Sequence, residues 1–187
     1  MALALCCLAG TAMAQTAATP TATATTDTRP EVSAALPQAQ LIGKGRLTVF
    51  GFQVYDARLW AAPDFRSRGD NGYATQPLAL ELSYLRDFKA LDIAERSIKE
   101  MRRSAAIPDE QQAKWLADMQ RVVPDVKKGD RILGIHKPGT GAEFWVNGKP
   151  VGDILDAEFA KLFFGIWLSP KTSEPQIRKL LLGGNPG

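Results

Sequence analysis

The clearest pattern in the chain is the segment PLALELSYL, residues 77–85, in which every second residue is a large apolar one. Successive side chains of a strand point to opposite faces, so this alternation predicts a half-buried strand. The segment GRLTVFGFQVYDARLWA, residues 45–61, predicts two further strands that meet near Gly51, where the missing side chain permits a tight turn or a bulge.

Two charged residues, Asp56 and Arg58, interrupt the apolar run VYDARLW. On a strand they share one face, whereas Tyr55, Ala57 and Leu59 share the other. They either form a solvated pair on an outer face or mark a polar point in a concave site. Because the opposite face suits packing under a helical layer, we expect an outer-face pair and a Tyr55 that faces the interior.

Four later segments repeat their apolar residues every three or four positions, which indicates amphipathic helices. They are expected after residue 87, between Pro108 and Pro124, over residues 156–168 and over residues 173–183. Between the second and third, residues 129–154 predict three strands in succession, with a hairpin turn at Asn147–Gly148. Runs of strands and runs of helices, rather than strict alternation, favour an α+β fold with a mainly antiparallel sheet.

The N-terminal region divides into two parts. Residues 1–14 are small and apolar and end in Ala-Met-Ala, which is typical of an export signal cleaved near Ala14. Residues 15–37 are rich in Thr, Ala and Pro and predict a disordered linker, because they offer few large apolar groups to bury. Residues 38–184 then suit a single domain. We expect a periplasmic protein without a transmembrane span.

Composition removes much of the usual catalytic chemistry. Both cysteines, Cys6 and Cys7, lie in the predicted signal, and His136 is the one histidine of the chain. A thiolate nucleophile, a disulfide and a multi-histidine metal site are therefore not expected in the mature protein, and no cofactor or metal is predicted. His136 is interpreted as a structural or surface residue. The net charge of +3 is too small to argue for nucleic-acid binding.

Four segments together carry a family resemblance. They are GKGRLTVFGFQVYDARLW, LELSYLRDF, VKKGDRILGIHKPGTGAEFWVNGKPVGDI and DAEFAKLFFGIWLSPKTSEPQIRKLLLG. In this order they resemble the bacterial exported branch of the chalcone isomerase-like family, over nearly all of residues 41–183. The resemblance implies an open β-sandwich, in which a large curved antiparallel sheet is covered by a layer of helices with an apolar ligand cleft between them.

The resemblance also suggests ligand-binding residues. In the plant isomerases, an arginine near the first long strand and nearby hydroxyl groups assist the closure of a chalcone phenolate, and the comparable residues here are Arg46, Thr48 and Tyr55. A guanidinium beside a hydroxyl would orient a carboxylate or a phenolate at the mouth of an apolar cleft. The alternative for Arg46 is a solvated cation on an edge strand. The lysine, tyrosine and asparagine that the enzymes use from their helical half have no match here, so the catalytic residues are unknown.

Three functions remain open at this stage, because the family includes both isomerases and proteins that bind fatty acids. We expect an exported domain that binds a small hydrophobic ligand, such as a carboxylic acid. The second hypothesis is an enzyme, an isomerase of the intramolecular lyase class that acts on an enone. The third is a noncatalytic scaffold of the cell envelope.

Overall fold

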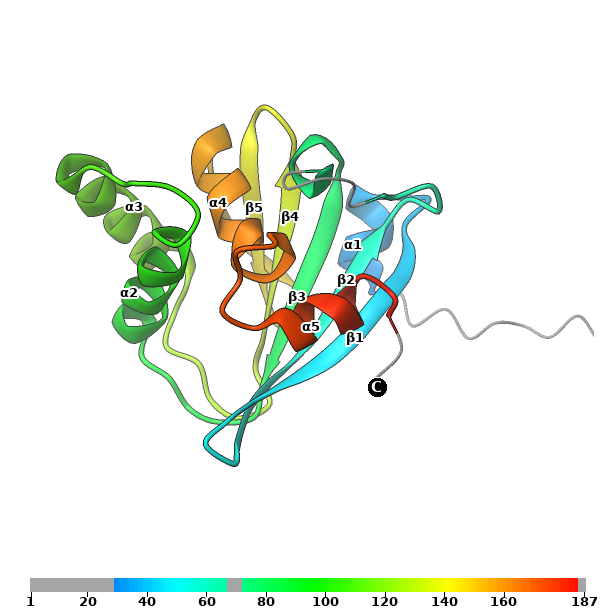
Figure 1. Ribbon diagram of the computed structural model, residues 1–187, viewed down its shortest axis with the longest axis horizontal. Helices are drawn as coiled ribbons and strands as arrows, with labels where there is room; N and C mark the ends of the chain where they lie inside the picture. Colours follow the sequence, from blue (N-terminus) through cyan, green and yellow to red (C-terminus); the bar gives the residue numbers. More distant parts are fainter. Residues whose placement is uncertain (1–28, 67–71, 185–187) are drawn as a thin grey trace, which may run out of the picture.

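The computed structural model describes residues 29–66 and 72–184. Its centre is a six-stranded antiparallel sheet in which each strand pairs with its neighbour in the sequence (Figure 1). The strands are β1 (Gln40–Val49), β2 (Phe52–Ala61), β3 (Leu78–Tyr84), β4 (Arg131–Lys137), β5 (Gly141–Val146) and β6 (Lys149–Ile154). The predicted antiparallel sheet and both predicted hairpin turns are thus confirmed.

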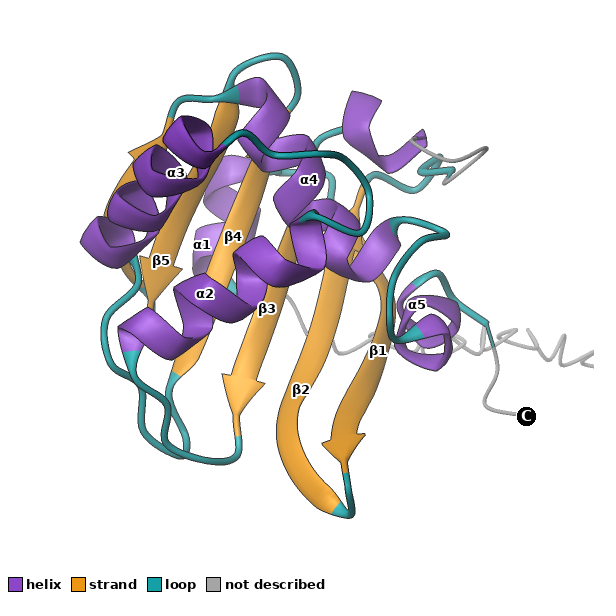
Figure 2. Ribbon diagram, turned by 60° about the vertical axis from the view of Figure 1, so that its left-hand side comes forward, coloured by secondary structure: helices purple, strands orange, loops and turns teal. Residues whose placement is uncertain are grey.

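Four helices cover one face of this sheet, and they correspond to the four predicted helical segments (Figure 2). They are α2 (Ala90–Met101), α3 (Asp109–Val122), α4 (Ala157–Leu168) and α5 (Pro175–Leu181). A short 3₁₀ helix, η1 (Gly72–Thr75), precedes β3. The predicted α+β fold, an antiparallel sheet under a layer of helices, is confirmed.

Helix α4 lies at the centre of this layer because its sequence is apolar almost all round. Its aromatic side chains contact one another along the helix, with Phe163 stacked against Phe159 and edge-on to Phe164 and Trp167. Asp156 caps the helix by accepting hydrogen bonds from the backbone N–H groups of the first turn. It also accepts a hydrogen bond from the indole of Trp115, which joins α3 to α4.

The opposite face of the sheet is covered by a helix that the sequence did not predict. Residues 30–37 were expected to belong to the disordered linker, but α1 (Pro30–Ala35) is a helix that packs on this face. Val32 of α1 is fully buried against Trp60, Ala79 and Leu133. Leu36 packs beside it, so the segment is ordered by apolar contact that the sheet supplies. The remainder of the predicted linker and the predicted signal lie outside the described residues.

A charged cluster extends this second face. Glu81 of β3 is fully buried, and its carboxylate accepts hydrogen bonds from Arg29, Arg58 and Arg131. Arg131 also pairs with Glu31 of α1. Strand β3 is therefore buried on both faces, whereas its alternating pattern predicted burial of one face alone. Charge pairing explains the difference, because a polar residue can be buried when its partners satisfy it.

Among the described residues, no helix has the length and apolar composition needed to cross a bilayer.

Candidate functional site

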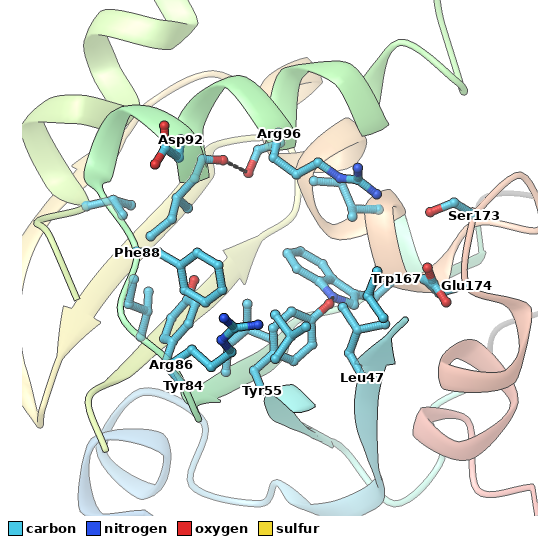
Figure 3. A pocket seen from close by; sticks show the side chains of 18 of the residues that line it. Leu47, Tyr55, Tyr84, Arg86, Phe88, Asp92, Arg96, Trp167, Ser173 and Glu174 are labelled. Atoms are coloured by element: carbon cyan, nitrogen blue, oxygen red, sulfur yellow. Dashed lines mark hydrogen bonds between the residues drawn. The ribbon is translucent and has the colours of Figure 1, made fainter. Parts of the chain in front are cut away.

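A cavity of about 590 Å³ lies between the sheet and the helical layer, close to the end of the β1–β2 hairpin (Figure 3). Residues of β1 to β4 form its floor, and residues of α2, α3 and α4 form its walls. Its apolar lining includes Leu47, Val49, Leu82, Phe88, Ile93, Met119, Val123, Ile132, Phe163 and Ile166. A mostly apolar cavity with a few polar groups is the usual form of a small-molecule site.

Tyr55 brings the first of these polar groups to the floor of the cavity. It lies on the helix-facing side of β2, and its hydroxyl accepts a hydrogen bond of 2.8 Å from the indole N–H of Trp167. Burial raises the pKa of Tyr55 to about 12. The phenol is therefore protonated at neutral pH, and its own proton is free for donation to a ligand.

Tyr84 supplies a second phenol beside the first. Its ring is edge-on to that of Tyr55 at a centroid distance of 6.2 Å, and it also contacts Phe88. Its hydroxyl makes no hydrogen bond to any residue that the structure describes. Burial raises the pKa of Tyr84 far above its ordinary value, so this group also stays neutral. The two phenols thus offer two hydrogen-bond donors within an apolar surround.

Arg86 supplies a cation at the same site. It follows β3 and lines the cavity, and its guanidinium lies 4.8 Å from the centre of the Phe52 ring. Figure 3 shows its side chain in the same part of the cavity as Tyr55, Tyr84 and Phe88. Among the described residues it has no carboxylate partner. An arginine that lacks a carboxylate partner beside an apolar cavity is suited to bind the acidic group of a ligand.

The helical side of the cavity carries a separate group of polar residues. Asp92, Arg96 and Ser97 come from α2, and Glu174 comes from the segment before α5. Arg96 is paired with Glu100 at 2.8 Å, so its charge is partly satisfied within the protein. Ser97 donates its hydroxyl proton to the backbone carbonyl of Ile93. These groups leave Arg86 as the better placed cation for an anionic ligand.

The three residues that the sequence suggested as a ligand site are not brought together. Tyr55 lines the cavity, whereas Arg46 and Thr48 are exposed on β1 and are absent from the cavity lining. Arg46 lies directly across from Asp56 in the β1–β2 pair, and Leu47 lies across from Tyr55. Partners in an antiparallel pair share a face, so Arg46 and Tyr55 are on opposite faces of the sheet.

Arg46 has its acidic partner within the protein. Its guanidinium donates two hydrogen bonds to Asp56, at 2.6 and 2.8 Å, and this contact holds the pKa of Asp56 below its ordinary value. Asp56 therefore lies on the face predicted for it. The predicted pair was Asp56 with Arg58, whereas the side chain that donates hydrogen bonds to Asp56 is that of Arg46. Arg58 donates to Glu81 and Ser83.

A bulge explains why the hairpin contributes so many residues to the cavity. The pairing of β1 with β2 shifts register between Leu47 and Thr48, and Val49 then pairs with Phe52. Val49 shares the face of Leu47 by ordinary alternation, and one extra residue on β2 brings Phe52 to the same side as Tyr55. Sequence alternation alone cannot find such a shift.

His136 has a structural environment. It is buried, its Nδ1 lies 3.0 Å from the carbonyl oxygen of Gln76, and its ring contacts Phe164. Burial lowers its pKa. Within residues 29–66 and 72–184 there is also no cluster of three or more His, Cys, Asp and Glu side chains that could hold a metal ion.

Sequence reasoning missed Arg86 and Trp167 as site residues. Arg86 was visible as the first cation after a strand that ends in a tyrosine, but strand order was needed to place it beside Tyr55. Trp167 follows the apolar stripe of its helix, and core packing was the simpler interpretation. Its hydrogen bond joins residues that are 112 positions apart in the chain.

Comparison with known proteins agrees with the geometry. A family model described as chalcone isomerase-like matches residues 21–183. An uncharacterized protein of Haemophilus influenzae is 30% identical over 144 residues, which cover 77% of this chain and 68% of that protein. The crystal structure of a fatty-acid binding protein of Arabidopsis thaliana has a similar fold, with a TM-score of 0.61 and 11% identity, over 78% of this chain and 87% of that one. The chain belongs to the chalcone isomerase-like family.

Proposed function

We propose that this protein binds a small hydrophobic acid of the fatty-acid type in the cavity between the sheet and the helices. The observation that carries the proposal is the position of Arg86, a guanidinium without a carboxylate partner among the described residues, next to two neutral phenols in an apolar cavity. The alkyl chain would lie against the apolar lining, and the carboxylate would accept hydrogen bonds from Arg86 and from Tyr55 or Tyr84.

The size and polarity of the cavity support this class of ligand. A volume of about 590 Å³ is within the range of roughly 300 to 1,000 Å³ that small-molecule sites occupy. The similar fold of a protein that binds fatty acids supports the same class. Binding requires no proton transfer, which suits a site whose two phenols are held neutral by burial.

The test compares two arginines by titration of a fluorescent fatty acid. Arg86→Ala should weaken binding roughly tenfold, which corresponds to about 1.5 kcal/mol for one charge-assisted hydrogen bond at a solvent-accessible mouth. Arg46→Ala is the matched control, because it removes the same charge from the opposite face of the sheet. Equal affinity of the parent and Arg86→Ala would contradict the proposed site, and weakening by Arg46→Ala alone would favour the site suggested by the sequence.

Native mass spectrometry of the purified protein distinguishes the other hypotheses. A co-purifying hydrophobic acid supports a binding protein. Protein that neither carries nor takes up such a ligand supports the scaffold. Turnover of a chalcone above the spontaneous rate, followed by its absorbance, would favour the isomerase.

We also propose that the protein is exported to the periplasm. The support is the small-residue motif at residues 12–14 after a short apolar run. N-terminal sequencing of protein from a periplasmic extract should begin at or near Gln15. An intact N-terminus, or lipid attached to Cys6 or Cys7, would contradict this proposal.

A further inference from the structure

The end of the β1–β2 hairpin exposes more apolar surface than any other turn of the described chain. Phe50 is 96% exposed and Phe52 is 59% exposed, and Val49 beside them is 36% exposed. Together these three residues form the hairpin tip, which projects beyond the neighbouring loops in both views (Figures 1 and 2). Contiguous exposed apolar side chains mark surfaces that contact another molecule or a membrane.

The backbone conformation of the tip is unfavourable for a phenylalanine at position 50. Phe50 and Gly51 have φ angles of 49° and 80°, and the β5–β6 turn at Asn147 and Gly148 has nearly the same values, 50° and 80°. Asn-Gly is the favoured pair for such a turn, because asparagine tolerates a left-handed backbone better than other residues with a side chain. The tip thus carries a phenylalanine where folding alone would favour asparagine, and this residue packs against almost nothing in the protein.

The tip also borders the cavity. Val49, Phe50 and Phe52 all contribute to its lining, and Arg86 covers the ring of Phe52. An apolar molecule that leaves a surface in contact with the tip would therefore reach the cavity without crossing a wide layer of water. This continuity joins the exposed tip to the ligand site.

Cations lie at the same end of the molecule. The loop that carries Arg86 is tied to the loop before β4 by a hydrogen bond from the backbone N–H of Lys128 to Asp87. The ammonium groups of Lys127 and Lys128 are exposed and make no ion pair with a described residue. Basic side chains beside an apolar tip complement an anionic lipid membrane, which has negatively charged head groups over an apolar interior.

We propose that the hairpin tip docks on an anionic lipid surface and that the cavity takes up its ligand there. The second part rests on the proposed function, and the docking itself does not. Phe50 and Phe52 would enter the boundary between head groups and acyl chains, while Lys127 and Lys128 contact the anionic head groups.

The small size of the tip favours a membrane over a protein partner. A stable protein interface buries about 800 Å² on each side, whereas one phenylalanine buries about 200 Å² at most. The hairpin tip offers two phenylalanines, one of which is partly covered, and a valine. Their combined surface area is too small for such an interface. They are sufficient for insertion into a membrane surface, where each buried apolar group adds to binding.

The experiment is sedimentation of the ligand-free full chain with vesicles of phosphatidylglycerol and phosphatidylethanolamine. The parent should bind these vesicles more tightly than vesicles of phosphatidylcholine, and added salt should weaken the binding. Phe50→Asn should lower the partition coefficient by about tenfold, which is what exposure of one phenylalanine predicts. Its thermal stability should equal or exceed that of the parent, because it restores the favoured turn pair, and unfolding would therefore not explain the loss.

Leu155→Asn is the matched control. Leu155 is 71% exposed and lies just after β6, at the opposite end of the sheet from the tip. This variant should keep the vesicle affinity of the parent. Absence of vesicle binding by the parent, equal binding by Phe50→Asn, or equal loss in Leu155→Asn would overturn the proposal. Phe50-dependent dimers in analytical ultracentrifugation without vesicle binding would also overturn it, and would assign the tip to self-association.

Failure of docking and failure of ligand binding are separable. The vesicles contain no free fatty acid, and the titration of Arg86→Ala uses no vesicles. A protein that binds the acid but not the vesicles retains the proposed function and loses this inference.

Discussion

The two faces of the sheet differ in how far their polar groups are satisfied by other residues. On the face covered by α2 to α5, the polar atoms of Tyr55, Tyr84 and Arg86 surround an open cavity. On the face covered by α1, Glu81 is enclosed by three arginines, and a small apolar cluster fills the remaining space. On the helical face, polar groups that can still form hydrogen bonds lie beside a cavity. On the α1 face, the charged groups satisfy one another. This difference is why the proposed ligand is assigned to the helical face.

Arg46 and Arg86 differ in the same way as the two faces. Arg46 is held by Asp56 through two hydrogen bonds, whereas Arg86 contacts an aromatic ring and no described carboxylate. Arg46 lies on β1, and Arg86 follows β3. Arg46 is the weaker candidate for a ligand anchor, because it lies on the face opposite Tyr55, is absent from the cavity lining and already has an acidic partner.

The largest test of this comparison is removal of the buried charge. Glu81→Gln should cost about 3 to 5 kcal/mol of the free energy of unfolding, because it leaves partly buried arginines without their carboxylate. Chemical denaturation followed by tryptophan fluorescence measures the loss. The folded variant should bind a fatty acid as the parent does, since Glu81 lies on the other face. Weakened binding by folded Glu81→Gln would show that the faces are not independent.

A smaller effect distinguishes the two phenols of the cavity. Tyr55→Phe should cost about 1 to 3 kcal/mol of stability, because the indole N–H of Trp167 loses its acceptor in a buried position. Tyr84→Phe should change stability little, since its hydroxyl has no hydrogen-bond partner among the described residues. Thermal melts of both variants check this. If the two substitutions cost the same, the Trp167 contact does not stabilise the fold.

The smallest effect is a dependence on pH at the α1 face. Burial alone would raise the pKa of Glu31, but its backbone hydrogen bond and Arg131 outweigh burial, so the pKa lies below the ordinary value of 4.5. A lowered pKa in the folded state gives stability that is present above about pH 4.5 and is lost as the pH falls through the folded value. The melting temperature of Glu31→Gln should therefore be lower than that of the parent at neutral pH, and the difference should shrink in acid. A difference that is constant from neutral to acidic pH would contradict an ionic contribution from Glu31.

Local patterns predicted most of the elements for a physical reason. The alternation in residues 77–85 and the three- to four-residue period after residue 87 depend on which side of a backbone is apolar, and this is a property of neighbouring residues. The turn at Asn147–Gly148 was also predictable, because its left-handed backbone favours those residue types. Helix α1 was not, because its order depends on contact with a distant surface.

The sequence by itself determined the strands, the helices, the α+β class and the family resemblance, because each depends on local periodicity or on ordered motifs. It also singled out Tyr55, on the inward face of β2, as the candidate for the cleft. Only the tertiary structure decided which cation accompanies it. The register of β1 against β2 sets Arg46 opposite Asp56, and the packing of β3 beside β2 brings Arg86 and Tyr84 to the cavity. The β1–β2 register depends on a bulge near Leu47 that the alternation does not reveal, and the pairing of β2 with β3 joins residues distant in the chain, such as Tyr55 and Tyr84.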